Sequence, residues 1–166
     1  MLGLKFVGWF ILVVMLLGAV PGWLHAGEPA WIFGVVGWRW LGGWLLLNGF
    51  GLSLWSAALF GRFGRGTPLP FAPPQRLVMA GPYRFVRNPM LLGYFLLLGG
   101  QALLMNSQRI FLYLLQVITI SFLYIVFVEE PQLAKRFGSA YGAYRRDVPR
   151  WIPRKPISAA SSPKTR

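Results

Sequence analysis

The chain has 166 residues, of which 55% are hydrophobic and 13% charged, and it holds no cysteine and one histidine. This composition is too apolar for an ordinary soluble domain and predicts an integral membrane protein, while the missing thiols exclude disulfides and leave no ligand set for a metal site. The net charge of +13 falls largely in two segments that flank apolar runs, as in the cytoplasmic loops of membrane proteins, so we expect no nucleic-acid partner.

The first apolar run, residues 4–23, is long enough to cross a bilayer as a helix and carries only Lys5 as a charge. A cleaved signal peptide is the alternative, because Lys5 provides a basic start. The run exceeds a usual signal core, however, and Trp9 and Trp23 lie near its ends, where interfacial anchors belong. We therefore expect a retained transmembrane helix.

A second span is expected at about residues 40–60, inside an apolar stretch that is longer than one straight crossing requires. The tryptophans nearby suggest an interfacial or re-entrant stretch over residues 31–38, before the span. Residues 1–60 thus form a region of two N-terminal spans without a motif that indicates a particular function.

A polar loop over residues 61–88 ends in the distinctive motif Gly81-Pro82-Tyr83-Arg84-Phe85-Val86-Arg87-Asn88-Pro89. Asn88 before Pro89 predicts a helix start, because an Asn side chain caps free backbone N–H groups and proline suits the first helical position. Arg84 and Arg87 therefore lie at a helix N-terminus, which suits an anionic group such as a carboxylate or phosphate. The alternative is topological, since arginines gather at the cytoplasmic ends of membrane helices in any case.

Residues 89–105 and 110–128 are two apolar spans joined by a tight turn, residues 106–109, so they must be antiparallel neighbours. This hairpin returns Glu129 and Glu130 to the membrane face that holds the polar loop. A count of about four spans, with the basic loop and tail on one side, places both termini in the cytoplasm. We expect an all-α fold, a multi-pass transmembrane helical bundle.

Glu129 and Glu130 are two of only four acidic residues, and they follow the end of a membrane helix, where the helix dipole and their mutual repulsion both disfavour them. In one interpretation they are solvated, or form an ion pair with Arg84 or Arg87. In the other they line a polar pocket at the membrane edge, which suits a zwitterionic or hydroxyl-bearing ligand. The residue types alone leave both open.

Four apolar or aromatic residues recur at helical spacing in the basic tail: Leu133, Phe137, Tyr141 and Tyr144. This pattern predicts a C-terminal amphipathic helix that lies along the membrane interface with one aromatic face. Residues 148–153 close the ordered region, and residues 154–166 are expected to form a disordered tail.

These motifs, in this order, resemble the isoprenylcysteine carboxyl methyltransferase and phospholipid methyltransferase superfamily. The resemblance covers residues 61–153, a catalytic region that runs from Gly-Pro-Tyr-Arg-x-x-Arg-Asn-Pro through Glu-Glu to Val-Pro-Arg-Trp-x-Pro. It implies an integral membrane enzyme that transfers a methyl group from S-adenosylmethionine to a lipophilic acceptor: an isoprenylcysteine-like carboxylate, a thiol or a phospholipid amine. Asn88 replaces the family's usual histidine and Leu91 stands where a tyrosine often follows, so Tyr94 is a candidate to supply the phenol.

The resemblance also implies roles for individual residues. Arg87 and Glu130 would be catalytic. The cofactor would be bound by Tyr83, Arg84, Arg87, Asn88, Pro89, Gly93, Glu129 and Glu130. The substrate would be bound by Tyr141, Tyr144, Arg150 and Trp151. Membrane lipids are the expected surroundings, and the short chain rich in tryptophan and arginine suggests a bacterial inner membrane.

Two other functions compete with methyl transfer. Membrane sterol reductases resemble the same end motif and bind a nicotinamide cofactor, but this chain is short for their larger bundles. A non-catalytic protein whose basic tail binds anionic lipid would explain the positive charge, but not the paired glutamates opposite paired arginines.

Overall fold

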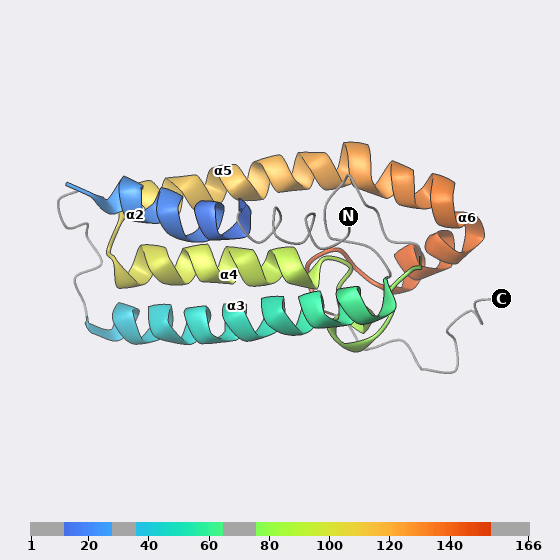
Figure 1. The fold of residues 1–166 in the computed structure, drawn as a ribbon, viewed down its shortest axis with the longest axis horizontal. Helices are drawn as coiled ribbons and strands as arrows, with labels where there is room; N and C mark the ends of the chain where they lie inside the picture. Colours follow the sequence, from blue (N-terminus) through green and yellow to red (C-terminus); the bar gives the residue numbers. More distant parts are fainter. Residues whose placement is uncertain (1–11, 28–35, 65–75, 154–166) are drawn as a thin grey trace. The chain divides into compact units, whose positions relative to one another are not determined.

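The structure, a computed structural model, describes residues 12–27, 36–64 and 76–153 (Figure 1). Its elements in chain order are η1 (Met15–Ala19), α2 (Val20–His25), α3 (Val36–Phe63), η2 (Gly81–Arg84), α4 (Pro89–Leu104), α5 (Gln108–Tyr124), η3 (Ile125–Glu129) and α6 (Glu130–Asp147). The described part of the chain contains helices and no strand, which confirms the all-α prediction. Two helical stretches, Gly37–Phe63 and Gln108–Asp147, are long and apolar enough to cross a membrane, and two shorter apolar helices accompany them.

The described residues fall into two compact units. The first unit contains the described residues of the ranges 1–53 and 91–121, and the second contains those of 54–90 and 122–166. The prolines of residues 65–75, the start of the first span, most of the stretch at 31–38 and the tail at 154–166 lie outside the described residues.

In the first unit, α3 and α4 touch through their backbones. A Cβ atom on Gly93 would lie 2.8 Å from the Gly49 carbonyl oxygen and 2.9 Å from the Ser53 nitrogen. A Cβ atom on Gly100 would lie 2.8 Å from the Gly42 carbonyl oxygen. Only glycine permits such approach, which is how helices pack tightly where there is no hydrophobic drive to hold them together.

The α4–α5 hairpin is confirmed, but its turn is shorter than predicted. The chain turns at Asn106, which has a positive φ of 50°, and α5 begins at Gln108. The Ser107 hydroxyl accepts a hydrogen bond from the Ile110 backbone N–H at 3.2 Å, as an N-cap does. This cap starts the helix before Arg109, which had been predicted to belong to the turn.

The N-terminal helix is held in the first unit by side chains that donate to its backbone carbonyls. The Gln101 amide donates to the Leu17 carbonyl at 2.7 Å, and the Tyr113 hydroxyl donates to the Leu16 carbonyl at 3.2 Å. Both carbonyls belong to η1, a π-helical turn, where the ordinary ladder of helix hydrogen bonds is interrupted. Retention of this helix in the mature protein stays a prediction.

Two predicted boundaries differ from the structure. The span expected at residues 40–60 begins at Val36, so the end of the expected interfacial stretch is already helical. The helix that forms the hairpin's second span does not end at the acidic pair, because α5 continues through the π-helical turn η3 directly into α6. Pro131 lacks an N–H and would clash with an α-helical carbonyl behind it, and a π turn at this point relieves the conflict.

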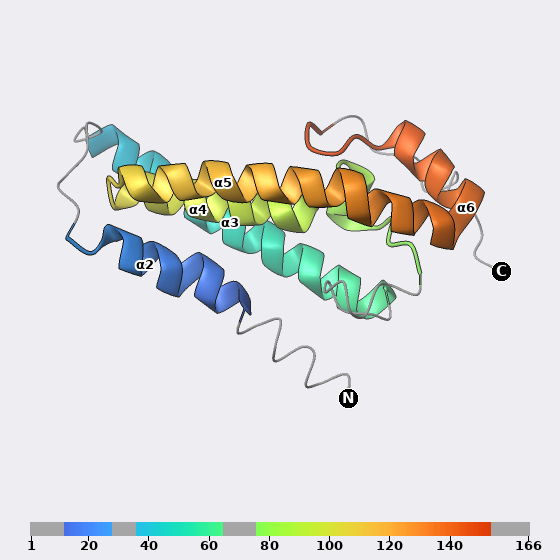
Figure 2. The same ribbon diagram turned by 90° about the horizontal axis from the view of Figure 1, so that it is seen from above.

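The tail helix α6 has the predicted aromatic face, and it is broken at Gly138. That residue has φ 52° and ψ −128°, a conformation that glycine tolerates and other residues do not. In Figure 2 the red end of α6 runs back past this point. Tyr141, Tyr144 and Val148 are buried and pack with four partly buried residues: Leu77, Met79, Leu133 and Phe137. The aromatic face is thus covered by protein from the segment before η2.

Candidate functional site

Three arginines of the second unit approach the carboxylate of Glu130, whose side chain is only 6% exposed. Arg87 donates from Nη1 to Oε1 at 2.8 Å. Arg150 donates from Nε to Oε1 at 2.6 Å and from Nη2 to Oε2 at 2.9 Å. Arg145 is a weaker neighbour, because its Nε lies 3.9 Å from Oε2 and its side chain is 55% exposed. A single buried carboxylate therefore faces several guanidinium groups.

Arg87 has hydrogen-bonding capacity that the described part of the chain does not use. Its side chain is 9% exposed, and Nη1 donates to the Tyr141 hydroxyl at 3.3 Å as well as to Glu130. Its Nε–H is buried and has no hydrogen-bond partner among the described residues. Buried donors are nearly always paired in native proteins, so this guanidinium N–H is a donor that an acceptor from outside the described residues, such as a ligand, could satisfy.

Two hydrogen bonds fix the motif of residues 81–89 against the end of α6. The Arg87 backbone N–H donates to the Pro149 carbonyl at 2.9 Å. The Tyr144 hydroxyl donates to the Tyr83 carbonyl at 2.7 Å, in a buried position. Burial accordingly raises the pKa of Tyr144. The Arg87 guanidinium is therefore held by a backbone that is itself anchored on both sides.

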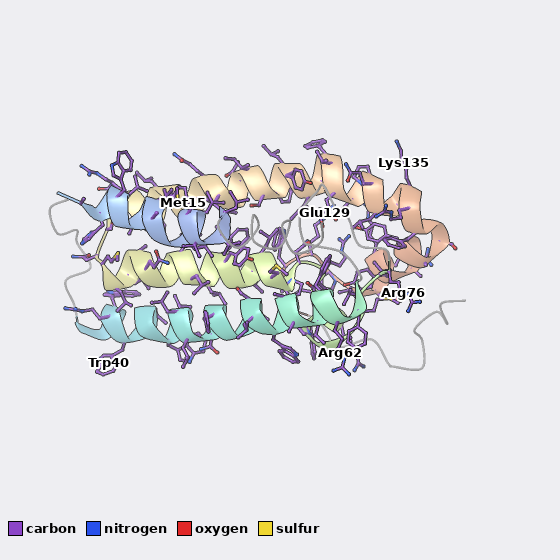
Figure 3. All side chains as sticks on the ribbon, viewed as in Figure 1. Met15, Trp40, Arg62, Arg76, Glu129 and Lys135 are labelled. Carbon is purple, nitrogen blue, oxygen red and sulfur yellow. The ribbon has the colours of Figure 1, made fainter. Side chains whose placement is uncertain are left out.

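The two glutamates of the pair have opposite electrostatic environments. Burial acts to raise the pKa of Glu130, but the hydrogen bond from Arg150 and the charges of Arg87, Arg150 and Arg145 outweigh it and hold that pKa below its usual value. Burial and the charge of Glu130 raise the pKa of Glu129, to which no cation within the described residues is ion-paired. Figure 3 shows Glu129 where η3 meets α6, with Lys135 projecting outward from α6 further along.

The structure brings together four of the predicted site residues in direct contact: Arg87, Glu130, Tyr141 and Arg150. Tyr144 donates a hydrogen bond to the Tyr83 carbonyl and so stabilises the backbone next to this group. Arg84 is the last residue of η2, and Pro89 is the first residue of α4, as predicted. Asn88 and Trp151 are the chain neighbours of Pro89 and Arg150. Gly93 belongs to the first unit, where its contact with α3 gives it a packing role. Its predicted contact with a cofactor stays a prediction.

Sequence reasoning left Arg84 and Arg87 as equal candidates to pair with the glutamates, and the structure pairs Arg87 with Glu130. It also missed the principal partner of Glu130, because Arg150 was assigned to the substrate. The Cζ atom of Arg150 lies 6.0 Å from the centroid of the Phe122 ring, a further contact that was not foreseen. The Val-Pro-Arg-Trp motif draws attention to this arginine, but nothing in the sequence indicates that it contacts Glu130.

The model of the family described as phospholipid methyltransferase matches residues 38–140. No curated protein and no solved structure matches the chain. The matched range includes Arg87, Glu129 and Glu130, and it ends immediately before Tyr141, so the Arg150 contact lies beyond it.

Proposed function

The chain belongs to the phospholipid methyltransferase family, and on this premise we propose that it uses S-adenosylmethionine to methylate a lipophilic acceptor. The family match confirms the resemblance predicted from the motifs. It indicates that the general activity is membrane methyl transfer. The single observation that supports the cofactor proposal is the buried cluster around Glu130, in which Arg87 keeps an unpaired N–H.

The residues of the cluster fit the zwitterionic amino acid end of S-adenosylmethionine. Arg87 suits a carboxylate, because a guanidinium donates strong, charge-assisted hydrogen bonds to that group. Glu129 and Glu130 suit an ammonium group or ribose hydroxyls, because an ionised carboxylate only accepts. When bound, the cofactor supplies an activated methyl group on a sulfonium. We therefore assign Arg87 to its carboxylate and the glutamates to its amino group or ribose.

The contribution of the chain to methyl transfer is positioning and shielding, since the reactive group belongs to the cofactor. Arg87 and Glu130 are buried, so charges there act with little screening by water. Tyr144 and the Pro149 carbonyl hold the backbone that carries Arg87. A carboxylate or thiolate acceptor needs no base, whereas an amine acceptor must first lose a proton. The acceptor in this proposal is lipophilic, reached from the lipid that surrounds the apolar helices.

The proposal is tested by a calorimetric titration of the purified protein in detergent. S-adenosylhomocysteine should bind, and a reduced nicotinamide cofactor should not. Binding of the nicotinamide cofactor alone would favour the reductase alternative. Binding of neither, with saturating binding of anionic lipid, would favour the non-catalytic alternative.

Variants then connect binding to the cluster. Arg87→Gln should weaken S-adenosylhomocysteine binding by about tenfold to hundredfold, the effect of losing a charge-assisted hydrogen bond. Arg146→Gln is the matched control, because Arg146 is exposed and lies outside the cluster. An equal affinity of the wild type and a folded Arg87→Gln protein would leave Arg87 with only its ion-pair role.

We also propose that both termini face the cytoplasm, with the cluster at the cytoplasmic edge of the bilayer. The basic residues of the loop and tail favour this orientation. A reporter fused after Pro153 should behave as cytoplasmic. Activity of the reporter on the opposite side would reject both the orientation and a cofactor drawn from the cytoplasm.

A further inference from the structure

The two arginines that contact Glu130 bind it unequally. Arg150 places Nε and Nη2 on the two different oxygens, at 2.6 and 2.9 Å. Arg87 places one nitrogen, Nη1, on a single oxygen at 2.8 Å. The two-point arrangement is the stronger and more directional of the two, because the planar guanidinium matches the carboxylate. Glu130 is therefore held mainly by Arg150.

Arg150 is itself held in place from several directions. It follows Val148, which is 1% exposed, and Pro149, whose carbonyl accepts the Arg87 backbone N–H at 2.9 Å. Its guanidinium lies over the Phe122 ring, at 6.0 Å from the centroid, within the range of a cation–π contact. The fork that binds Glu130 is thus oriented by the surrounding protein.

This arrangement changes what Arg87 can do. A carboxylate buried beside a single cation cannot lose it without becoming an uncompensated charge. Because Arg150 already bonds both oxygens of Glu130, the Nη1 contact of Arg87 can be given up at lower cost. Arg87 also retains the buried, unpaired Nε–H, which no residue of the described chain accepts.

We propose that Arg150 is a positioning residue that holds Glu130 and thereby keeps Arg87 available for the anionic end of a ligand. The inference deepens the proposed function and rests on it for the identity of that ligand, the carboxylate of S-adenosylmethionine. The division of work between the two arginines does not depend on the ligand and can be measured without it.

The first test is a pH titration of the Glu130 carboxyl carbon by NMR in detergent, on ligand-free protein. The groups that face this carboxylate are Arg87, Tyr141, Arg145 and Arg150, with Glu129 next to it in the chain. Arg150→Gln should raise the titration midpoint more than Arg87→Gln does. Arg150→Lys should lie between wild type and Arg150→Gln, because lysine keeps the charge and loses the fork.

The control in this titration is Arg146→Gln, which removes the same charge from an exposed position and should leave the midpoint unchanged. A larger shift in Arg87→Gln than in Arg150→Gln would overturn the proposal, because Arg87 would then be the main partner of Glu130. Equal shifts would overturn it as well.

The second test adds the ligand. Arg150→Gln should weaken S-adenosylhomocysteine binding about tenfold, because Arg87 becomes the remaining close partner of Glu130 and is no longer free. The acid limb of its binding profile should also move to higher pH, which a general loss of folding would not produce. Arg150→Lys should recover part of the affinity. Wild-type affinity in a folded Arg150→Gln protein would contradict the positioning role.

The two tests separate the two proposals. Failure of the wild type to bind S-adenosylhomocysteine would reject the proposed function, while the carboxyl titration would still decide whether Arg150 holds Glu130. Binding by the wild type with the wrong order of titration shifts would reject the positioning role alone.

Discussion

The two units of this protein use polar side chains in different ways. In the first unit, Gln101, Tyr113 and Arg109 all donate to backbone carbonyls of the N-terminal helix. In the second unit, Arg87 and Arg150 donate to the side chain of Glu130. Polar groups of the first kind bind backbone carbonyls of the N-terminal helix, whereas those of the second kind bind a buried charge.

The difference shows which interactions determine how the helices pack in each unit. The first unit relies on close backbone approach at glycines, together with a few hydrogen bonds that select how helices dock. The second unit relies on a buried charge cluster, which is costly to assemble and destabilising to break. A cluster of this kind is weak evidence for stability and stronger evidence for function.

The largest effect is expected from breaking the cluster. Glu130→Gln should lower stability by about 3 kcal/mol, because it strands two guanidinium groups that the carboxylate now compensates. Thermal unfolding in detergent measures this, with Asp147→Asn, a change of the same type at an exposed residue, as the control. Equal unfolding midpoints for the two variants would contradict this, because they would mean that water already compensates the charges of the two guanidinium groups.

A double variant sharpens the same comparison. Arg87→Gln with Glu130→Gln should regain part of the stability lost in the single variants, because neither partner of the pair is left charged. It should nevertheless bind no S-adenosylhomocysteine and transfer no methyl group. Full activity with any lipophilic acceptor that the wild type methylates would show that these two residues have only a structural role.

The corresponding change in the first unit is Gly93→Ala. The added Cβ would lie 2.8 Å from the Gly49 carbonyl oxygen, so α3 and α4 must separate, at a cost of about 2 kcal/mol. Gly43→Ala is the matched control on α3, because nothing lies within 4 Å of its Cβ position. That substitution should be neutral or stabilise the helix by up to about 1 kcal/mol. A stable Gly93→Ala protein would mean that the glycine contact is not tight.

Loss of single tyrosine hydroxyls should distinguish the units on a smaller scale. Tyr144→Phe removes the buried 2.7 Å hydrogen bond to the Tyr83 carbonyl, for a loss of about 1 kcal/mol. Tyr113→Phe removes a 3.2 Å bond near the surface of the first unit and should cost less. Chemical unfolding of both variants compares them directly. A larger loss of stability in Tyr113→Phe would mean that the hydrogen bond to the N-terminal helix contributes more than the one to the Tyr83 carbonyl.

The smallest effect concerns pH. The raised pKa of Glu129 means that its ionisation opposes folding at neutral pH, and this penalty disappears as pH falls through its folded pKa. The lowered pKa of Glu130 means that its contribution is present above the ordinary value of 4.5 and is lost only as pH falls through its lower folded pKa. Stability should therefore rise slightly on mild acidification and fall in stronger acid. Glu129→Gln should abolish the rise and keep the fall.

The sequence by itself determined the fold class, the hairpin and the start of α4. Long apolar runs can be satisfied only by helices in lipid, and Asn88-Pro89 begins α4 where local chemistry predicts it. The spacing placed Leu133 with Phe137 and Tyr141 with Tyr144 on one face of each helical segment, because a helix repeats its faces at a fixed period. Across the break at Gly138, both pairs join one cluster. These features depend on neighbours in the sequence.

Only the tertiary structure decided which charges meet. Arg84 and Arg87 are equivalent in the sequence, yet the Arg87 backbone is anchored to Pro149 and its side chain reaches Glu130. Arg150 could not be assigned to the same carboxylate from its motif, because the two residues meet through the break at Gly138 and the fold of the segment after α6. Periodicity and local propensity carry no information about such contacts, since pairing between distant side chains is decided by how the backbone between them turns.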